Sequence, residues 1–378
     1  MSGTDVARLV LVAEGRDEEI ASVIDSVGAA RVVEILVDEI SCRFDWPQVS
    51  PAETVVVGFC FKHKAEDVVQ VITAGTSGVA PADRTMEPHA QVEQELTEAV
   101  RAVFGPPGAP KTSTRRVQLR GSDSKAAFIQ PPPAFYVVQR ITSTMDARDA
   151  VDLNELATRY RADKWGIHFY TQHYQRHFEP LRHRPLTILE IGVGGLGLED
   201  PSMGGASLRM WKRYFPRALV YGVDIEDKAP VAEQRIGILR ADQSNHSALA
   251  KVVDATGPLD VIIDDGSHVN EHVLTSFRTL FPYLRDGGIY VIEDLQTAYW
   301  PRFGGTSDAP DDGLTSVGFL KSLIDALNYE EILESGSRQS TPYDGAIRGL
   351  HFYHNIVFIE KGLNVEGGGP DWVRYGQR

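Results

Sequence analysis

The 378-residue sequence contains little cysteine and no long apolar run. Its two cysteines, Cys42 and Cys60, supply neither a disulfide framework nor a set of metal ligands, and their apolar neighbours predict buried free thiols. No apolar run approaches the ~20 residues of a membrane span, and the N-terminus lacks a basic stretch followed by an apolar segment. We therefore expect a cytoplasmic protein with no membrane partner.

Positive charge is also scarce. The chain has 38 Lys and Arg against 52 Asp and Glu, which gives a formal net charge of −14. Nucleic-acid binding requires a basic patch or stripe, and no dense basic run is present, so we expect no nucleic-acid partner. The remaining composition, at 42% hydrophobic and 24% charged, is that of a globular protein long enough for two domains.

The N-terminal part of the chain predicts a small mixed α/β domain over residues 1–145. Helical spacing of apolar residues indicates helices, and a β-branched, aromatic run indicates a strand over 54–61. The segments expected to be helical are 4–45, 68–72 and 92–103. No catalytic motif is found here, so the expected role is auxiliary, either in oligomer contacts or as a wall of a neighbouring subunit's pocket. Residues 105–134 are rich in Pro, Gly and Ser and predict a linker or a long surface loop.

Residues 146–378 are expected to form the catalytic domain. From residue 186 onward, strand-like apolar runs alternate with helical segments, which predicts a Rossmann-like α/β fold with a doubly wound, mostly parallel sheet. Two late runs, 350–353 and 355–360, predict a hairpin at the sheet edge. The expected strands are 186–191, 219–223, 236–239, 259–263 and 289–293, and the expected helices are 207–214, 247–253, 269–284 and 314–327.

Acidic and glycine residues follow the first two strands of this sheet. The run Glu190-Ile191-Gly192-Val193-Gly194 allows a tight turn and close approach of a ligand to the backbone. Asp224 ends the second strand, where an acid accepts hydrogen bonds from ribose hydroxyls. Asp242 and Gln243 end the third strand, where they can contact an adenine edge. These residues predict a nucleoside cofactor.

The identity of that cofactor follows from the acid that leads the motif. A G-x-G alone is weak evidence, because glycines after strands are common and dinucleotide sites carry G-x-G-x-x-G. An acid suits the cationic amino acid part of S-adenosylmethionine better than a pyrophosphate. With Asp224 and Asp242 in register, S-adenosylmethionine is preferred over a dinucleotide or a purely structural sheet.

A second group of acids follows the next two strands. Asp265, Glu293 and Asp294 come directly after apolar runs that are expected to be neighbours in the sheet. Clustered carboxylates repel one another unless a cation neutralises them, and oxygen ligands select hard cations such as Mg²⁺, Ca²⁺ or Mn²⁺. These three residues therefore predict a site for a hard divalent cation, and an all-oxygen set of ligands suits Mg²⁺ and Mn²⁺ alike.

His268 follows Asp265 by three residues and is the candidate general base. A neutral imidazole can take a hydroxyl proton near neutral pH, particularly from an oxygen polarised by a metal. The alternative is structural: Asp264, Asp265 and Ser267 cap the next helix, and His268 lies on its first turn. The acids at Glu293 and Asp294 favour the metal interpretation.

Several long blocks, in order over about residues 150–372, resemble the deoxysugar O-methyltransferases of antibiotic biosynthesis. They are L-E-I-G-V-G-G, G-G-A-S-L-R-M-W-K-R-Y-F-P, Y-G-V-D-I, I-I-D-D-G-S-H, Y-V-I-E-D-L-Q-T-A-Y-W-P and L-H-F-Y-H-N-I-V-F-I-E-K-G. The resemblance is looser over residues 1–145. It implies a metal-dependent S-adenosylmethionine methyltransferase that assembles as a tetramer.

The resemblance also implies residue roles. It implies carboxylate ligands for Mg²⁺ at Asp265, Glu293 and Asp294, and a general base at His268. The block A-D-K-W-G-I-H-F-Y-T-Q-H-Y resembles a segment that folds over the cofactor, or else it is an aromatic helix face that packs on the sheet. The remaining cofactor candidates are Lys164, His168 and Tyr170 from this block, Ser207, and Asp264.

The expected function is transfer of the methyl group of S-adenosylmethionine to a sugar hydroxyl of a glycosylated natural product. A catechol or another aromatic diol is the alternative acceptor, because a metal serves either diol. Acceptor choice is expected in the loop 299–318, where Tyr299, Trp300 and Phe303 either line a pocket or pack the loop. A cofactor-binding scaffold with a decayed site is the non-enzymatic alternative, and it is disfavoured because every expected ligand is present.

Overall fold

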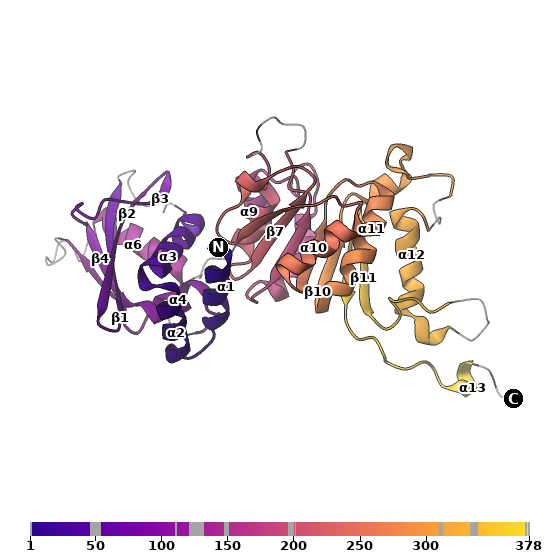
Figure 1. Ribbon diagram of the computed structural model, residues 1–378, viewed down its shortest axis with the longest axis horizontal. Coiled ribbons are helices and arrows are strands. Elements are labelled where there is room, and N and C mark those ends of the chain that lie inside the picture. Colours follow the sequence, from indigo (N-terminus) through magenta and orange to yellow (C-terminus); the bar gives the residue numbers. More distant parts are fainter. Residues whose placement is uncertain are drawn as a thin grey trace. The chain divides into compact units, whose positions relative to one another are not determined.

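The computed structural model contains two compact units, each described separately below (Figure 1). The first comprises Met1–Asp152, Leu181–Pro185 and Arg213–Arg217, and the second comprises the rest of the chain. The structure describes residues 2–45, 54–109, 112–120, 132–146, 151–195, 200, 202–309, 313–332, 339–374 and 376. Parts of the predicted linker (110–111 and 121–131), residues 147–150 beside the predicted boundary, and 310–312 of the predicted acceptor loop lie outside the described residues.

The first unit combines helices with a five-stranded sheet of order β3-β2-β1-β4-β5. Its strands are β1 (Val55–His63), β2 (Glu66–Gly75), β3 (Gly78–Pro81), β4 (Ala90–Glu95) and β5 (Arg116–Leu119). Its helices are α1 (Ser2–Val12), α2 (Asp17–Val27), α3 (Ala29–Arg43), α4 (Leu96–Phe104) and α6 (Pro133–Met145). Apolar side chains from the helices and from β1, β2 and β4 form one core. The predicted mixed α/β character is therefore present.

Several details of the first unit differ from the sequence predictions. Residues 68–72 belong to strand β2 and not to a helix, because this β-branched run pairs antiparallel with β1. The expected helix over 92–103 begins only at Leu96, after strand β4. Part of the predicted linker forms β5, which pairs with β4. Cys42 and Cys60 are free thiols but only half-buried.

The second unit contains the predicted doubly wound sheet, with strand order β11-β12-β10-β9-β6-β7-β8. Its five parallel strands are β6 (Thr187–Ile191), β7 (Leu219–Asp224), β8 (Ile236–Arg240), β9 (Leu259–Asp264) and β10 (Leu284–Ile292). Strands β11 (Ile347–Tyr353) and β12 (Ile356–Lys361) add an antiparallel hairpin beside β10. Both the Rossmann-like sheet and the edge hairpin are confirmed.

Helices cover this sheet and bury one apolar cluster against it. The α-helices are α7 (Leu153–Tyr160), α8 (Thr171–Phe178), α9 (Ala206–Tyr214), α10 (His246–Thr256), α11 (Asn270–Leu280), α12 (Ser316–Leu327) and α13 (Asp371–Arg374). The 3₁₀ helices are η1 (Glu179–Leu181), η2 (Ala229–Val231), η3 (Phe281–Tyr283), η4 (Leu295–Tyr299), η5 (Pro301–Phe303) and η6 (Tyr329–Glu331). Helix α11 ends at Leu280, before the predicted end at residue 284, where η3 takes over.

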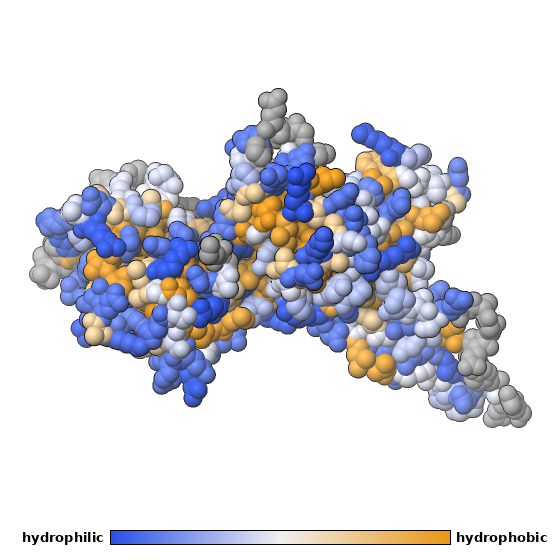
Figure 2. Space-filling model, in the orientation of Figure 1, coloured by the Kyte–Doolittle hydropathy of each residue, from blue (hydrophilic) through white to orange (hydrophobic). Residues whose placement is uncertain are grey.

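The described part of the chain has no helix with the length and apolarity needed to cross a bilayer. On the face shown in Figure 2, hydrophilic residues dominate, and apolar residues form separate patches between them. The strand order matters more for function. Strand β9 lies between β10 and β6, and β6 pairs with β7, so the carboxyl ends of four parallel strands meet at one edge.

Candidate active site

A cavity of about 240 Å³ lies at the carboxyl ends of the central strands. Five of the predicted cofactor residues line it: Gly192, Gly194, Asp224, Asp242 and Gln243. The other lining residues are Ile191, Val223, Ile225, Ala241, Asp265, Gly266, Ser267 and His272. These predicted cofactor residues, which lie at the ends of β6, β7 and β8, therefore share one cavity.

The glycines after β6 are required by the geometry of this edge. Gly192 has φ +95°, and a Cβ there would lie 2.1 Å from the Asp265 carbonyl oxygen. Only glycine lets the chain leave β6 so close to the chain leaving β9. Gly194 also has a positive φ, of +78°, but faces open space. A ligand in the cavity can therefore approach the backbone at Gly194.

Two acids of the cavity are held by backbone amides. Asp224 Oδ2 accepts a hydrogen bond from the Val193 amide at 3.0 Å, and its Oδ1 accepts one from the Glu226 amide at 2.9 Å. Asp242 Oδ1 accepts hydrogen bonds from the Ser244 hydroxyl at 2.7 Å and amide at 2.8 Å, which lower the pKa of Asp242. Both carboxylates are therefore oriented before any ligand binds.

Asp264 does not line the cavity but orients Gln243, which does. The Gln243 amide group donates to Asp264 Oδ1 at 2.6 Å, and Gln243 Oε1 accepts from the Ser267 amide at 2.9 Å. The Ser276 hydroxyl donates to the other Asp264 oxygen. Burial raises the pKa of Asp264 to about 6 in spite of these hydrogen bonds. Asp264 thus acts on the cavity through Gln243.

Glu190 is fully buried beside the cavity. Its Oε2 accepts a hydrogen bond from the Ser207 hydroxyl at 2.9 Å. Its Oε1 makes no close hydrogen bond among the described residues, and the indole N–H of Trp211 lies near the carboxyl without a close partner of its own. Burial raises the pKa of Glu190 to about 8, against the favourable charge of Lys164. A buried acceptor without a donor is uncommon in proteins and suits a ligand that brings a cationic donor. The Glu190 carboxyl therefore suits the amino group of the predicted cofactor.

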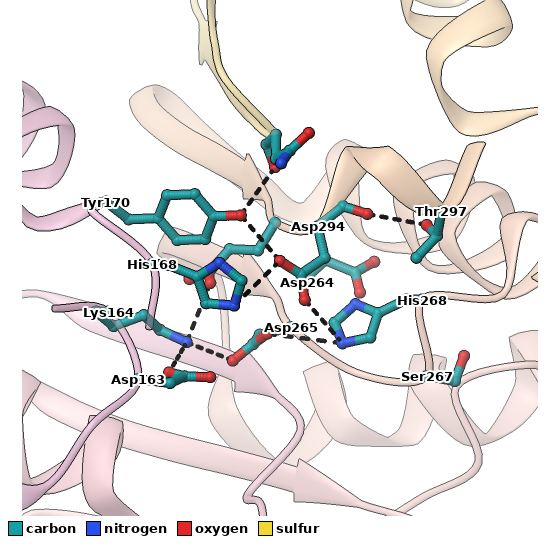
Figure 3. A network of polar contacts seen from close by, with 12 residues as sticks. Asp163, Lys164, His168, Tyr170, Asp264, Asp265, Ser267, His268, Asp294 and Thr297 are labelled. Carbon is teal, nitrogen blue, oxygen red and sulfur yellow. Dashed lines mark hydrogen bonds and ion pairs between the residues drawn. The ribbon is translucent and has the colours of Figure 1, made fainter. Parts of the chain in front are cut away.

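Two acids and a histidine form what we call the acidic centre: Asp265, His268 and Asp294 (Figure 3). One possible ligand atom from each lies within 4.8 Å of the others. His268 Nε2 is 3.9 Å from Asp265 Oδ1 and 3.6 Å from Asp294 Oδ2. Asp265 also lines the cavity, so the acidic centre and the cavity share a residue. The carboxylate oxygens here are suitable ligands for a hard cation.

The backbone is left-handed at two residues of the acidic centre. His268 has φ 56° and Asp294 has φ 54°. Such conformations cost non-glycine residues on the order of 1 kcal/mol or more and concentrate at functional sites. Asp294 follows directly after Glu293. The left-handed backbone at Asp294 therefore lets the side chains of these two adjacent acids point in different directions.

Lys164 lies against the acidic centre and not in the cavity. Its ammonium nitrogen is 2.5 Å from Asp265 Oδ2, 3.0 Å from Glu293 Oε2 and 3.0 Å from Asp163 Oδ1, and the side chain is fully buried. Burial opposes the charge, but the three carboxylates outweigh it and hold the pKa of Lys164 well above its ordinary value. Lys164 therefore remains a cation that neutralises this cluster.

Glu293 does not belong to the group of converging ligand atoms. Its Oε2 faces Lys164, and its Oε1 accepts a hydrogen bond from the buried Tyr174 hydroxyl. Burial and the nearby Asp265 raise the pKa of Glu293 well above its usual range, against the charge of Lys164. Its expected role as a metal ligand stays a prediction. Sequence reasoning missed Tyr174, although it lies in the aromatic block that begins near Lys164.

Tyr170 and His168 contact the acidic centre through Asp294. The Tyr170 hydroxyl donates to Asp294 Oδ1 at 2.8 Å, and His168 Nε2 is 3.7 Å from the same oxygen. The two rings stack with centroids 4.7 Å apart. Burial and Asp294 raise the pKa of Tyr170, so its hydroxyl stays a donor. Neither residue lines the cavity, whereas His272 on α11, which sequence reasoning missed, does.

The contacts of Lys164 predict a large stability effect. We expect Lys164→Met to lower the free energy of unfolding by about 3 kcal/mol in EDTA, because it leaves buried carboxylates without their cation. Urea unfolding monitored by near-UV circular dichroism measures this loss. Lys251→Met, at an exposed position on α10, is the matched control and should change stability by less than about 0.5 kcal/mol. An equally small loss of stability in both variants would contradict the role of Lys164 as the cation that neutralises the buried carboxylates.

Comparisons with known proteins show the family of the chain. Residues 6–115 match the family described as MycE methyltransferase N-terminal. The chain is 44% identical to the 8-demethyl-8-alpha-L-rhamnosyl tetracenomycin-C 2'-O-methyltransferase of Streptomyces olivaceus, over 99% of both chains. It is 40% identical to the mycinamicin VI 2''-O-methyltransferase of Micromonospora griseorubida, over 98% of this chain and 93% of that protein.

A solved structure extends the comparison. It is the MycE methyltransferase from the mycinamycin biosynthetic pathway in complex with Mg, SAH and mycinamycin VI. The match has a TM-score of 0.88 and 39% identity, and it covers 98% of this chain and 96% of that chain. The chain therefore belongs to the family of sugar O-methyltransferases that these relatives represent, and it is an S-adenosylmethionine-dependent O-methyltransferase.

Proposed function

We propose that this enzyme methylates a sugar hydroxyl of a glycosylated natural product in an antibiotic pathway, with Mg²⁺ at the acidic centre. One observation carries the proposal: Asp265 belongs both to the cavity at the strand ends and to the acidic centre. A methyl donor in the cavity and a hydroxyl at the acidic centre would thus meet at one residue. The named acceptors and the bound Mg of the relatives support this assignment.

The cavity would hold S-adenosylmethionine. Asp224, held by two backbone amides, would accept hydrogen bonds from the ribose hydroxyls. Asp242 and Gln243 would contact the adenine, and Asp264 would fix Gln243. Glu190 has an unpaired buried oxygen that suits the cationic amino group.

The acidic centre would hold Mg²⁺ through Asp265 and Asp294, with Glu293 as the predicted third carboxylate ligand. When bound, a divalent cation orients a hydroxyl and lowers its pKa. Mn²⁺ suits the same oxygen ligands. Lys164 and Tyr170 would position Asp265 and Asp294, because each contacts one of them directly.

His268 would act as general base. Its Nε2, between the two acids, would take the proton of the acceptor hydroxyl as the oxygen forms a bond to the methyl carbon. The bond from that carbon to sulfur breaks, and its electron pair stays on the sulfur of the departing S-adenosylhomocysteine. Alignment of the oxygen with the carbon–sulfur bond would supply much of the acceleration.

Two acceptor classes fit the chemistry, and one experiment separates them. The relatives' names place their methyl groups on 2- or 3-hydroxyls of sugars, which favours a glycoside. The exposed rings of Tyr299 and Trp300 suit either a macrocyclic glycoside or an aromatic diol. A panel of deoxysugar glycosides and catechols should be assayed with S-adenosylmethionine and Mg²⁺. Transfer to catechols alone would overturn the sugar assignment, and no transfer at all would revive the scaffold alternative.

Glu190 allows a test of the cofactor assignment. We expect Glu190→Gln to weaken S-adenosylmethionine binding on the order of 10- to 100-fold by calorimetry, because a charge-assisted hydrogen bond is lost. Folding raises the pKa of Glu190 to about 8, above its value in the unfolded chain. The protonated carboxyl therefore contributes fully to stability below the unfolded pKa, and this contribution is lost as the pH rises through 8. The variant should therefore be at least as stable as the wild type at pH 9.

The control for this test is Glu271→Gln, at an exposed position on α11, which should leave the affinity unchanged. Unaltered cofactor affinity in Glu190→Gln would contradict the assigned contact. A drop in stability at pH 9 would indicate that the carboxylate is structural in the ionised form.

We further propose that residues 1–145 form an auxiliary domain that contributes contacts to a homotetramer, with residues 146–378 as the catalytic domain. A cytoplasmic location accords with the lack of a membrane-crossing helix among the described residues. Light scattering coupled to size exclusion measures the assembly. A monomer of 41.7 kDa would overturn the tetramer.

A further inference from the structure

A second cluster of potential ligands shares no residue with the acidic centre. It consists of His177 near the end of α8, His351 on β11 and Glu360 on β12, with one possible ligand atom from each within 4.8 Å of the others. In the β11–β12 hairpin, Gly349 pairs with Glu360, so His351 lies diagonally across from that acid on the same face. We call it the hairpin cluster.

The spacing of the hairpin cluster is close to that of a metal site. His351 Nε2 is 3.2 Å from Glu360 Oε1, and His177 Nδ1 is 3.9 Å from the same oxygen. Zinc with nitrogen and oxygen ligands at about 2.0–2.1 Å in a tetrahedron requires ligand atoms roughly 3.3 Å apart. Small movements of these side chains are therefore sufficient.

The surroundings of His177 prepare it as a ligand. Its side chain is buried, and its Nε2 is 3.0 Å from the Tyr353 hydroxyl, which leaves Nδ1 directed toward Glu360. Metal-bound histidines usually carry a hydrogen-bond partner on the second ring nitrogen, as His177 does here.

A glycine on β11 lies directly beside two of the ligand groups. A Cβ at Gly349 would lie 3.0 Å from His351 Nε2 and 3.5 Å from Glu360 Oε2. Any other residue at this position would therefore fill the space beside both ligand groups. Arg348 contacts Glu360 Oε2 at 3.4 Å from an exposed position, so it competes weakly and leaves Oε1 available.

We propose that the hairpin cluster binds a first-row divalent transition-metal ion of the zinc class. Two imidazole nitrogens and one carboxylate oxygen select Zn²⁺ and similar ions over Mg²⁺, which requires oxygen ligands. The hairpin cluster and the acidic centre thus differ in chemistry. Excess Mg²⁺ does not compete for the hairpin cluster.

The ion ties together two elements that reach the acidic centre. Helix α8 follows directly after Tyr170, whose hydroxyl bonds Asp294. The turn of the hairpin brings the Asn355 carbonyl to the Tyr170 hydroxyl at 3.4 Å and to the Leu295 amide at 3.0 Å. An ion held by His177 on the helix and by both hairpin strands fixes these segments relative to each other. The role of the ion is structural. The quantities that report it are the affinity for the ion and the melting temperature of the protein.

The test is a calorimetric titration of the full chain with ZnCl₂ in excess Mg²⁺, on the wild type, His351→Ala and Glu360→Gln. The wild type should take up one Zn²⁺ more per chain than either variant. His354→Ala, at an exposed position in the same hairpin turn, is the matched control and should bind as the wild type does. Zn²⁺ should also raise the melting temperature of the wild type and of the control, but not that of His351→Ala.

Two further variants keep all three ligands. Tyr353→Phe and Gly349→Ala should each weaken Zn²⁺ binding on the order of 10-fold or more, through the lost partner of His177 and the filled space. Equal Zn²⁺ uptake by wild type, His351→Ala and Glu360→Gln would overturn the proposal. So would the absence of a Zn²⁺-dependent rise in melting temperature in the wild type. Neither readout depends on methyl transfer, so the result stands apart from the proposed function.

Discussion

His268→Ala should reduce methyl transfer on the order of 10² to 10⁴-fold, the range expected when a general base is removed. The binding of S-adenosylmethionine should change little, because His268 does not line the cavity that would hold it. The pH profile of the wild-type rate should show the ionisation of a catalytic base, and the profile of the variant should lack it. Steady-state kinetics over pH 6–9, with calorimetric binding at pH 7.5, measures both effects.

A structural role for His268 has a different signature. His268 occupies a left-handed conformation, so the alanine variant carries the same backbone strain without the side-chain contacts and can lose stability. Asn tolerates this conformation better, so a His268→Asn variant that is as inactive as the alanine variant but more stable separates chemistry from folding. His246→Ala, at an exposed position on α10, is the control. Near-wild-type turnover in both His268 variants would show that another group takes the proton.

The catalytic half of the fold could be predicted because its signals are local. Apolar runs of four to six residues predicted the parallel strands, and four of the five runs are followed directly by glycine or an acid. Parallel strands bring such ends to one edge of the sheet. Gly192, Asp224 and Gln243 lie in one cavity for this reason. By contrast, 68–72 carries apolar residues at spacings that fit both a helix and a strand, and only pairing with β1 decides between them.

The positions that could not be predicted depend on contacts between distant segments. Lys164 meets Asp265 across 101 positions of the chain, and Tyr174 meets Glu293 across 119, so no local pattern reports either contact. The adjacent acids Glu293 and Asp294 look equivalent in sequence. In the structure one is buried against Lys164 and the other turns to the acidic centre at a left-handed residue. The catalytic and metal-binding roles of these residues stay predictions.

Asp265→Asn should lower methyl transfer on the order of 10² to 10³-fold, because the loss of a carboxylate ligand removes several kcal/mol of metal stabilisation. Mg²⁺ binding, measured by calorimetry, should become undetectable at millimolar concentration. The control is Asp254→Asn, at an exposed position on α10, which should behave as the wild type does. Some weakening of cofactor binding is expected, since Asp265 also lines the cavity.

Chelation distinguishes the loss of a metal from the loss of a cavity contact. EDTA should lower wild-type turnover about as far as Asp265→Asn does, roughly 10²- to 10³-fold. It should have no further effect on the variant. Both treatments remove the same interaction between metal and carboxylate, and the effects of coupled changes do not add. If the two effects instead multiply, the metal acts without Asp265, and the carboxylate serves the cofactor or pairs with Lys164 alone. Turnover that is indifferent to EDTA in the wild type would leave a methyltransferase in which His268 and the ammonium of Lys164 carry the chemistry without a metal.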